Sequence, residues 1–433
     1  QYFEEVQSLK VLIGYDRRFM ANKFAESIIP YVKASGLEPI LAKTYVTTPS
    51  CSFYAKESKI LGALVITASH NPYYWLGLKI KSFNGCSVNE LFTRGVEQRL
   101  SLGNQIEPIE CEASRVDIKQ FHLERIRSLF DTKYILKKLK EMRLKVFIDA
   151  MHGSAANSFD QIFYGGASDI IKGVRENSDA YFGGNPPEPL LNNLSFLKNI
   201  LSNEDEDFKT IGIVFDGDGD RISVIDEKGR YCSTQTLLPY FINYLGKKNN
   251  NSYPVLKTVS GSDIIKKISE EQNRLVYELP VGFKFIAEKM INENIFIGGE
   301  ESGGVGFGDF LPERDALYAS MILLSGITEQ SKYLFQSLDE IQENYGPSFY
   351  DRVDIYFPDL SKKNKLKDFI NQNIPEKICN HFVQEVSRID GIKLRIDSNY
   401  WVLFRFSGTE PLLRLYCEGP SREIVQKTLD WSQ

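Results

Sequence analysis

The chain has 433 residues, more than one hydrophobic core usually organises, so we expect several domains. It is 42% hydrophobic and 25% charged and has no apolar run near the ~20 residues of a membrane span, which argues against a membrane protein. A net charge of -5 with only short basic runs argues against nucleic acid as the main partner, and six scattered cysteines give no disulfide or zinc framework. The first residues do not resemble a secretory signal, so we expect a cytoplasmic location.

Apolar runs alternate with helical patterns over most of the chain. Short continuous runs, each closed by a polar or glycine-bearing loop, are typical of buried parallel strands and lie at 11–14, 63–67, 146–149 and 211–215. Apolar residues at helical spacing predict helices over 19–35 and 135–142. From about residue 348 the pattern changes to aromatic-rich strands at 349–357 and 400–406. The sequence therefore predicts an α/β protein that ends in an α+β segment.

The segment 216–221, Asp-Gly-Asp-Gly-Asp-Arg, places three carboxylates on alternate positions directly after an apolar run. Carboxylates this close raise one another's pKa, and a hard divalent cation relieves their repulsion. A calcium EF-hand is the main alternative, but Arg221 stands where that loop needs glycine, and both flanks are strand-like. We therefore predict a divalent metal loop, with a solvated acidic turn as the structural alternative.

The segment 67–72, Thr-Ala-Ser-His-Asn-Pro, begins where the run 63–67 ends. Loops at the carboxyl ends of parallel strands are where α/β proteins place ligands. Ser69 and His70 are sequence neighbours and cannot readily form a catalytic pair, and no G-x-S-x-G elbow is present, so a serine hydrolase is disfavoured. Taken alone, this serine is more often an ordinary turn residue than a nucleophile.

Two later segments carry groups suited to a sugar phosphate. The segment 298–304 is glycine-rich and offers Glu and Ser side chains to sugar hydroxyls. The segment 405–411, Arg-Phe-Ser-Gly-Thr-Glu-Pro, is followed by Arg414, and arginines with hydroxyls suit a phosphate dianion. An ordinary loop between strands is the alternative for the second segment.

Taken in this order, the four segments resemble the signature of the α-D-phosphohexomutase family, the phosphoglucomutases and phosphomannomutases. The resemblance extends from residue 11 to about 419 and includes 14–19 and 280–284. It implies three related α/β domains and a C-terminal α+β domain around a central cleft. We place these domains at 1–130 (phosphoserine loop), 131–228 (metal loop), 229–346 (sugar-recognition loop) and 347–433 (phosphate-binding loop).

The resemblance also implies the roles of individual residues. It makes Ser69 the phosphoserine, and it gives the Mg²⁺ ligands as Asp216, Asp218, Asp220 and an oxygen of phosphorylated Ser69. The other expected catalytic residues are Lys79, His70 and Arg221, with the acid–base role open between Lys79 and His70. The expected substrate-binding residues are Arg18, Lys284, Glu300, Ser302, Arg405, Ser407, Gly408, Thr409 and Arg414.

The implied activity is interconversion of hexose 1-phosphate and hexose 6-phosphate through phosphoserine and a hexose 1,6-bisphosphate intermediate and activator. We expect a phosphoglucomutase acting as a monomer or weak homodimer. The alternatives are a phosphomannomutase or dual-specificity enzyme, then a phosphoglucosamine mutase, and finally a non-catalytic sugar-phosphate binding protein. A metal-dependent phosphatase is disfavoured, because no aspartate nucleophile motif precedes the acidic loop.

Two departures from the family pattern stand out. Leu76 replaces the usual Asn before Gly77. An earlier Gly-Thr-Asp-Gly-x-Arg-type loop has no counterpart, so we expect that the first strand and one arginine near the phosphoserine are missing from this sequence.

Overall fold

The computed structural model describes residues 6, 8–103, 106–204, 207–407 and 411–433. The chain forms two compact units, each built from discontinuous segments. The first contains Gln1–Thr234, Ile286–Ile295 and Ser302–Phe335, and the second contains Gln235–Phe285, Phe296–Glu301 and Gln336–Gln433. Among the described residues, no helix combines the length and apolar character that a membrane crossing requires.

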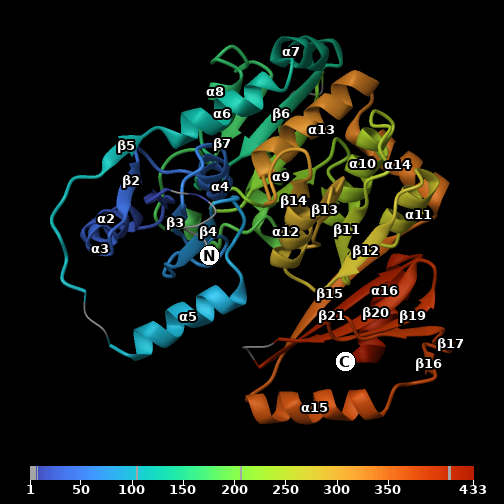
Figure 1. The fold of residues 1–433 in the computed structure, drawn as a ribbon. Coiled ribbons are helices and arrows are strands. Elements are labelled where there is room, and N and C mark those ends of the chain that lie inside the picture. Colours follow the sequence, from blue (N-terminus) through green and yellow to red (C-terminus); the bar gives the residue numbers. More distant parts are fainter. Residues whose placement is uncertain (1–5, 7, 104–105, 205–206, 408–410) are drawn as a thin grey trace. The chain divides into compact units, whose positions relative to one another are not determined.

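The first sheet of the first unit has the strand order β4-β3-β1-β2-β5. Figure 1 labels its strands β2, β3, β4 and β5. Its strands are β1 (Lys10–Tyr15), β2 (Glu38–Ala42), β3 (Gly62–Ile66), β4 (Leu78–Ser82) and β5 (Ser114–Val116). β1 pairs in parallel with β2 and β3, β5 is parallel to β2, and β4 is antiparallel to β3. The runs predicted at 11–14 and 63–67 are therefore neighbouring parallel strands.

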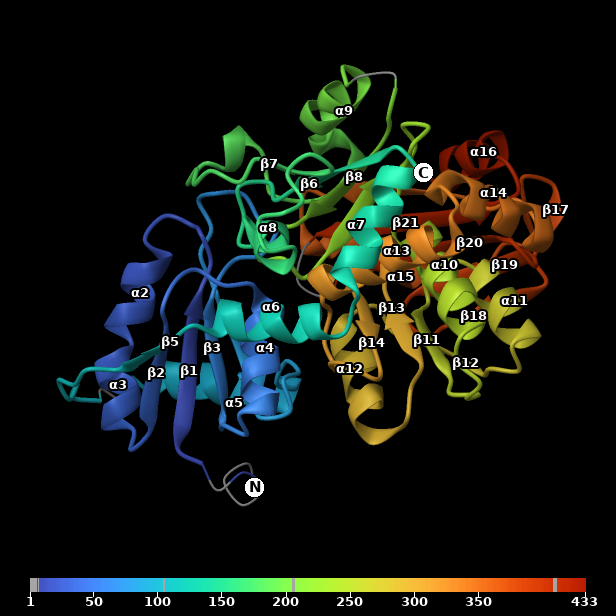
Figure 2. The same cartoon turned by 90° about the horizontal axis from the view of Figure 1, so that it is seen from above.

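Helices cover both faces of this sheet, which explains why β1 is apolar at every central position. The covering helices are α2 (Ala21–Ser27), α3 (Ile29–Ala34), α4 (Thr48–Glu57) and α6 (Ile118–Ser128), while α5 (Glu90–Ser101) buries none of its residues. Leu12 packs with side chains of α4 and α6, whereas Val11 and Ile13 pack with side chains of α2 and α3. Figure 2 shows these helix pairs on opposite sides of the sheet. This sandwich fixes the ends of β1 and β3, from which the Asp16 and Ser69 loops begin.

The single helix predicted over 19–35 is wrong, because the structure has two helices, α2 and α3, that meet at Ile28. Pro30 lies in the first turn of α3. Proline has no N–H to donate to the preceding turn and its ring crowds that turn, so it disfavours a continuous helix. At the start of a helix the missing donor costs nothing, and α3 begins there.

The second sheet, also in the first unit, has the order β10-β9-β8-β6-β7. Its strands are β6 (Leu144–Asp149), β7 (Ile171–Val174), β8 (Lys209–Phe215), β9 (Ile222–Ile225) and β10 (Tyr231–Cys232). β6 is parallel to β7 and β8, and β8 pairs with β9 in an antiparallel hairpin that places Phe215 opposite Ile222. The acidic segment 216–221 is therefore a hairpin loop between buried strands, as its strand-like flanks predicted.

The first unit also contains α7 (Thr132–Glu141), α8 (Ser158–Ile162), α9 (Ser195–Ser202), β14 (Val305–Phe307) and α13 (Ala316–Gln330), with short 3₁₀ turns at Phe182–Gly184 and Leu191–Asn193. The helix predicted over 135–142 corresponds to α7, which buries Ile135 and Leu139. Helix α13 is buried over most of its length, and the side chain of Asp315 caps its first turn.

In the second unit, β11 (Val255–Thr258) pairs in parallel with both β12 (Val276–Leu279) and β13 (Ile297–Gly299). Helices α10 (Thr234–Gly246), α11 (Ile264–Glu271), α12 (Phe283–Asn292) and α14 (Leu334–Tyr345) belong to the same stretch of sequence. This parallel arrangement is the third α/β pattern along the chain.

The C-terminal part of the second unit is an antiparallel sheet with the order β15-β21-β20-β19-β18. Its elements are β15 (Phe349–Tyr356), α15 (Leu360–Gln372), the pair β16 (Lys377–Ile378) and β17 (His381–Phe382), β18 (Glu385–Ser387), β19 (Ile392–Asp397), β20 (Tyr400–Phe406), β21 (Leu412–Gly419) and α16 (Arg422–Ser432). Side chains of α15 and α16 join one apolar cluster with Val402 and Phe404 of β20. The alternate residues of β20, including Arg405, consequently face away from these helices.

Candidate active site

Ser69 lies in the loop that follows β3 and has a left-handed backbone conformation, with φ 52°. An L-residue rarely adopts this conformation without support from its surroundings. The Ser69 N–H donates to Oγ1 of Thr67 at 2.9 Å, and the residue is buried. The loop is thus held in one conformation that directs the serine hydroxyl inward.

Arg18, predicted as a substrate contact, holds the Ser69 loop in this structure, and its contact with substrate stays a prediction. Its side chain is 1% exposed and pairs with the carboxylate of Asp16, 3.2 Å from Nε. Its two terminal nitrogens donate to four carbonyl oxygens of the Ser69 loop, those of Ser69 (2.6 Å), Asn71 (2.6 Å), Pro72 (2.8 Å) and Trp75 (3.2 Å). Both terminal nitrogens of the guanidinium are thus used by the Ser69 loop.

The acidic hairpin loop packs directly against the Ser69 loop. A Cβ added at Gly217 would lie 2.5 Å from the Ser69 carbonyl oxygen, so only glycine allows this approach. Inside the hairpin, Oδ1 of Asp216 accepts the N–H groups of Asp220 at 2.9 Å and Arg221 at 3.1 Å. These contacts fold the loop around the carboxylates and place the other Asp216 oxygen, Oδ2, 2.9 Å from the Ser69 hydroxyl.

Asp216, Asp218 and Asp220 are fully buried, and each offers a carboxylate oxygen within 4.8 Å of the others. Burial and the two neighbouring carboxylates raise the pKa of Asp216 well above its usual value. The Oδ1 atoms of Asp218 and Asp220 are buried and accept no hydrogen bond from the described residues. Unpartnered, converging anionic oxygens fit a hard divalent cation, so these three residues can hold a metal ion.

Two cations from other parts of the first unit also contact these carboxylates. Lys79 on β4 donates to Oδ2 of Asp218 at 2.6 Å and of Asp220 at 3.0 Å. Arg314 donates to the same Asp220 oxygen at 2.7 Å. Burial alone would raise the pKa of Asp220, but Arg314, Lys79 and Arg221 outweigh burial and hold that pKa far below its usual value. Burial would likewise lower the pKa of Lys79, but the aspartates raise it, so the ammonium stays charged.

His70 and Arg221 lie at the rim of this cluster. Burial, followed by the charge of Arg221, lowers the pKa of His70 to about 3, so its imidazole is neutral at physiological pH. Nε2 of His70 and Nη1 of Arg221 lie 3.8 and 3.6 Å from the same Glu188 oxygen. Of the two predicted acid–base candidates, His70 is therefore in its basic form and Lys79 in its acidic form.

Sequence reasoning missed two contacts to the acidic loop. Thr48 donates from its hydroxyl to Asp218, 170 residues away, and Arg314 reaches Asp220 across 94 residues. Thr48 begins α4, and its N–H also donates to the Asp218 carbonyl at 2.9 Å. The signal for Arg314 was the charged triplet 313–315 immediately before the apolar helix α13.

The predicted phosphate contacts Arg405 and Arg414 lie side by side on β20 and β21 in the second unit, as directly opposed residues. Like charges in this position repel. Each arginine is balanced by one carboxylate: Asp390 accepts from Nε of Arg405 at 2.8 Å, and Asp354 lies 3.7 Å from Nε of Arg414. Arg352, which the sequence analysis did not identify, lies on β15 two residues from Asp354 and contacts its carboxylate at 3.2 Å.

Two contacts connect these arginines to the other predicted loops of the second unit. Oδ2 of Asp390 also accepts the Val281 N–H at 2.9 Å, in the loop that leads to Lys284. Glu301, which follows the buried Glu300, lies 3.4 Å from Arg352. The structure thus links the segments that carry the predicted residues Lys284, Glu300, Arg405 and Arg414.

Ser302 belongs to the first unit, where the neighbouring Gly303 carbonyl accepts the Ile222 N–H at 3.0 Å beside the acidic hairpin. The Ser407 carbonyl accepts from Lys363 at 2.7 Å in the second unit. Gly408 and Thr409, also predicted to bind substrate, lie outside the described residues.

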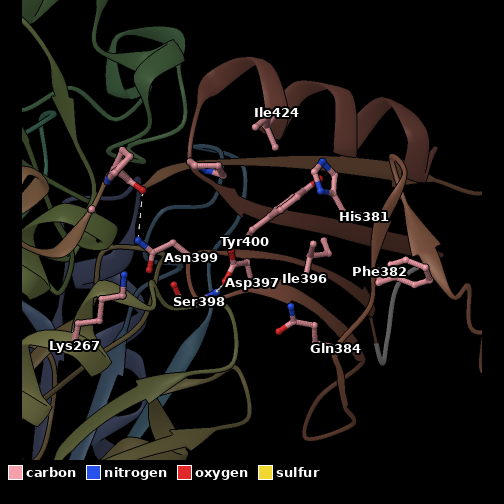
Figure 3. Close-up of a pocket in the computed structure, with 13 residues that line it drawn as sticks. Lys267, His381, Phe382, Gln384, Ile396, Asp397, Ser398, Asn399, Tyr400 and Ile424 are labelled. Atoms are coloured by element: carbon pink, nitrogen blue, oxygen red, sulfur yellow. Dashed lines mark hydrogen bonds between the residues drawn. The ribbon is translucent and has the colours of Figure 1, made fainter.

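A cavity of about 540 Å³ lies elsewhere in the second unit, between the loop at Gly346 and β17, β19 and β20 (Figure 3). Lys267, Gln384 and Asn399 give it polar groups, and the rings of His381 and Tyr400 meet edge to face with centroids 5.7 Å apart. Its lining includes none of the predicted site residues. The cavity therefore does not mark the chemistry described above.

Comparison with protein families matches four domains in chain order. The α/β/α domains I, II and III of phosphoglucomutase/phosphomannomutase match residues 1–106, 120–229 and 234–345. The phosphoglucomutase/phosphomannomutase C-terminal domain matches residues 369–430. The four matches together cover most of the chain.

Individual proteins agree with this assignment. A phosphoglucosamine mutase of Methanocaldococcus jannaschii is 28% identical over 426 residues, covering 97% of this chain and 90% of that protein. A phosphoglucomutase/phosphomannomutase of Thermococcus kodakarensis is 26% identical over 431 residues, covering 97% and 88%. The crystal structure of a "putative phosphomannomutase" of Thermus thermophilus has a TM-score of 0.85 at 28% identity and covers 100% of this chain and 91% of that one. The chain therefore belongs to the phosphoglucomutase/phosphomannomutase family, the α-D-phosphohexomutases, which are intramolecular phosphotransferases with three α/β domains and a C-terminal domain.

Proposed function

We propose that this protein interconverts glucose 1-phosphate and glucose 6-phosphate by way of phosphorylated Ser69 and glucose 1,6-bisphosphate. The observation that carries the proposal is the position of the Ser69 hydroxyl, 2.9 Å from Asp216 in a buried cluster of three aspartates and two cations. The hydroxyl of Ser69 is paired with Asp216 and not with a histidine, and no G-x-S-x-G nucleophile elbow is present, which disfavours acyl transfer. The same serine beside a metal loop suits phosphoryl transfer.

Phosphoryl transfer needs charge neutralisation and in-line placement more than covalent chemistry. Mg²⁺ held by Asp216, Asp218 and Asp220 would neutralise charge on the transferring group. Lys79, Arg221 and Arg314 add fixed positive charge around the same point, in a buried site where each contact is stronger than in water.

The reaction requires two transfers. In the first, the P–O bond to Ser69 breaks, a bond forms to the free hydroxyl of the sugar phosphate, that hydroxyl gives up its proton, and the Ser69 oxygen gains one. His70 is neutral and Lys79 is charged, but a pKa of about 3 makes His70 a weak base, so the acid–base role stays open between the two. In the second, the P–O bond between the other phosphoryl group and the sugar breaks, that group bonds to the Ser69 oxygen, which gives up its proton, and the sugar oxygen gains one, so the enzyme ends as it began.

The phosphate that does not react needs a separate binding place, which we assign to Arg405 and Arg414. Two directly opposed guanidinium groups repel each other, and an anion bound between them removes that cost. Lys284, Ser407, Gly408 and Thr409 are the proposed additional phosphate contacts, and Glu300 and Ser302 are proposed for the sugar hydroxyls.

The choice of glucose rests on the segment Gly299-Glu300-Glu301-Ser302-Gly303, which resembles the phosphoglucomutase and dual phosphoglucomutase/phosphomannomutase forms of the loop better than the phosphoglucosamine mutase form. The second candidate is glucosamine, because similar proteins include phosphoglucosamine mutases. The test is mutase turnover with glucose, mannose and glucosamine 1-phosphates under saturating Mg²⁺ and the matching bisphosphate. We expect the highest kcat/KM with glucose 1-phosphate. A higher value with glucosamine 1-phosphate would overturn the sugar assignment, and no turnover of any of the three would overturn the function.

A further inference from the structure

The three consecutive charged residues Glu313, Arg314 and Asp315 stand immediately before α13, and the outer two are almost completely buried. The Glu313 carboxylate accepts from the ammonium of Lys81 on β4 and, at 3.2 Å, from the Ser87 hydroxyl. The side chains of Lys81 and Glu313 are 1% and 2% exposed. A buried ion pair with this many contacts fixes the backbone on the N-terminal side of Arg314.

Asp315 is held from a different direction by His122 of α6. Nε2 of His122 donates to Oδ2 of Asp315 at 2.8 Å, and the Ser50 hydroxyl of α4 lies 2.9 Å from the other ring nitrogen. His122 is fully buried, so both ring nitrogens find their partners within the protein. The second Asp315 oxygen caps α13 by accepting the Tyr318 N–H at 3.0 Å.

Between these two anchors, Arg314 donates to Asp220 of the acidic hairpin, and its Nε lies 3.8 Å from the Glu313 carboxylate. The Arg314 N–H also donates to Glu313 at 3.0 Å, and Asp315 has an extended backbone, with φ -141° and ψ 100°. Anchoring residues 313 and 315 in the first sheet and its helices therefore fixes where residue 314 points.

We propose that His122 and Lys81 are positioning residues that fix Arg314 at the reacting phosphoryl group, an inference that rests on the proposed mutase function. Neither residue lies at the acidic loop itself. They act through the backbone of the charged triplet. The competing interpretation is that the two contacts only stabilise the fold.

A double-mutant cycle separates these interpretations, because a residue that acts through Arg314 has no effect on catalysis once Arg314 is gone. The variants are His122→Asn and His122→Gln, each made with Arg314 present and with Arg314→Ala. Glutamine carries its amide nitrogen about as far from Cα as Nε2 and keeps the donor to Asp315, whereas asparagine reaches only about as far as the other ring nitrogen. Leu123→Ala, a buried neighbour on α6, is the matched control for lost stability.

We expect His122→Asn to lower kcat about tenfold to a hundredfold, as misplacement of a catalytic group does, and His122→Gln to restore most of the loss. In the Arg314→Ala background, itself reduced on the order of 10²–10³-fold, His122→Asn should change kcat less than about threefold. Leu123→Ala should lower the thermal midpoint and leave kcat of the folded enzyme the same in both backgrounds. Equal losses from His122→Asn in both backgrounds would overturn the proposal.

Hydrogen exchange of the peptide spanning 311–318 provides a readout that needs no turnover. With the protein free of metal and substrate, His122→Asn should raise exchange in this peptide, and His122→Gln should leave it near wild type. Unchanged exchange in His122→Asn would contradict the anchoring even if the enzyme proved not to be a mutase. If the wild type showed no turnover but the two His122 variants changed hydrogen exchange in this peptide as expected, only the proposed function would be refuted.

Discussion

Replacement of Arg18 by methionine tests the support of the Ser69 loop. The substitution keeps most of the side-chain volume but removes the donors to the Ser69, Asn71, Pro72 and Trp75 carbonyls. It also leaves Asp16 buried without its cation. Removing one partner of a buried pair costs roughly 3–5 kcal/mol, so we expect a free energy of unfolding lower by about that amount.

The loss of stability should depend on pH in a defined direction. Burial raises the pKa of Asp16 to about 6 even though Thr67 and Arg18 oppose it. When the pKa of a carboxyl is higher in the folded state than in the unfolded state, the free energy of unfolding falls as pH rises from the unfolded-state pKa to the folded-state pKa. Without Arg18 the folded-state pKa rises further, so the loss continues to higher pH. The difference in unfolding free energy between wild type and Arg18→Met should therefore be smaller at pH 5 than at pH 8.

Denaturant unfolding at both pH values and mutase turnover at neutral pH are the assays. We expect kcat to fall about a hundredfold or more, because an unsupported Ser69 loop moves the nucleophile relative to Asp216. Arg17→Met is the control, since Arg17 donates to the Gly153 and Glu176 carbonyls instead. A stability difference independent of pH, or equal kcat losses for both variants, would refute the support role of Arg18.

Two further predictions concern the metal and phosphate groups. Asp218→Asn should weaken Mg²⁺ binding in calorimetry and abolish Mg²⁺-dependent turnover, because it removes charge from a cluster in which Oδ1 of Asp218 and Oδ1 of Asp220 accept no hydrogen bond. Unchanged Mg²⁺ affinity would contradict the ligand role. Arg414→Ala should raise KM about tenfold to a hundredfold with a smaller change in kcat, since a charge-assisted contact contributes roughly 1.5–3 kcal/mol. Replacement of the exposed Lys427 by alanine is the control. A fall in kcat at unchanged KM in Arg414→Ala would indicate that Arg414 contacts the reacting phosphate instead.

The local sequence was sufficient to predict features that depend on residues close together in the chain. The Ser69 loop and the acidic hairpin each follow an apolar strand, and both could be recognised because strand, turn and charge stand together in sequence. The break near Pro30 was missed, although proline inside a helical pattern is a local signal for one.

Features that depend on distant residues could not be read in this way. In the sequence, Arg18 is an arginine in a loop. Only the fold buries it against the carbonyl of Ser69, which lies 51 residues further along the chain. Arg314 and Thr48 reach the acidic loop through the packing of whole domains, with no spacing rule to reveal it. The sugar preference and the cytoplasmic location stay predictions.

The most direct test of the proposed mechanism is whether Ser69 carries the transferable phosphoryl group. Wild type and Ser69→Ala are incubated with glucose 1,6-bisphosphate and Mg²⁺, and their intact masses are measured before and after addition of glucose 1-phosphate. We expect the wild type to gain the mass of one phosphoryl group with glucose 1,6-bisphosphate. Excess glucose 1-phosphate should then remove this group from the protein and form bisphosphate. Ser69→Ala should not be phosphorylated. The same phosphorylated fraction in both proteins would contradict the proposed mechanism.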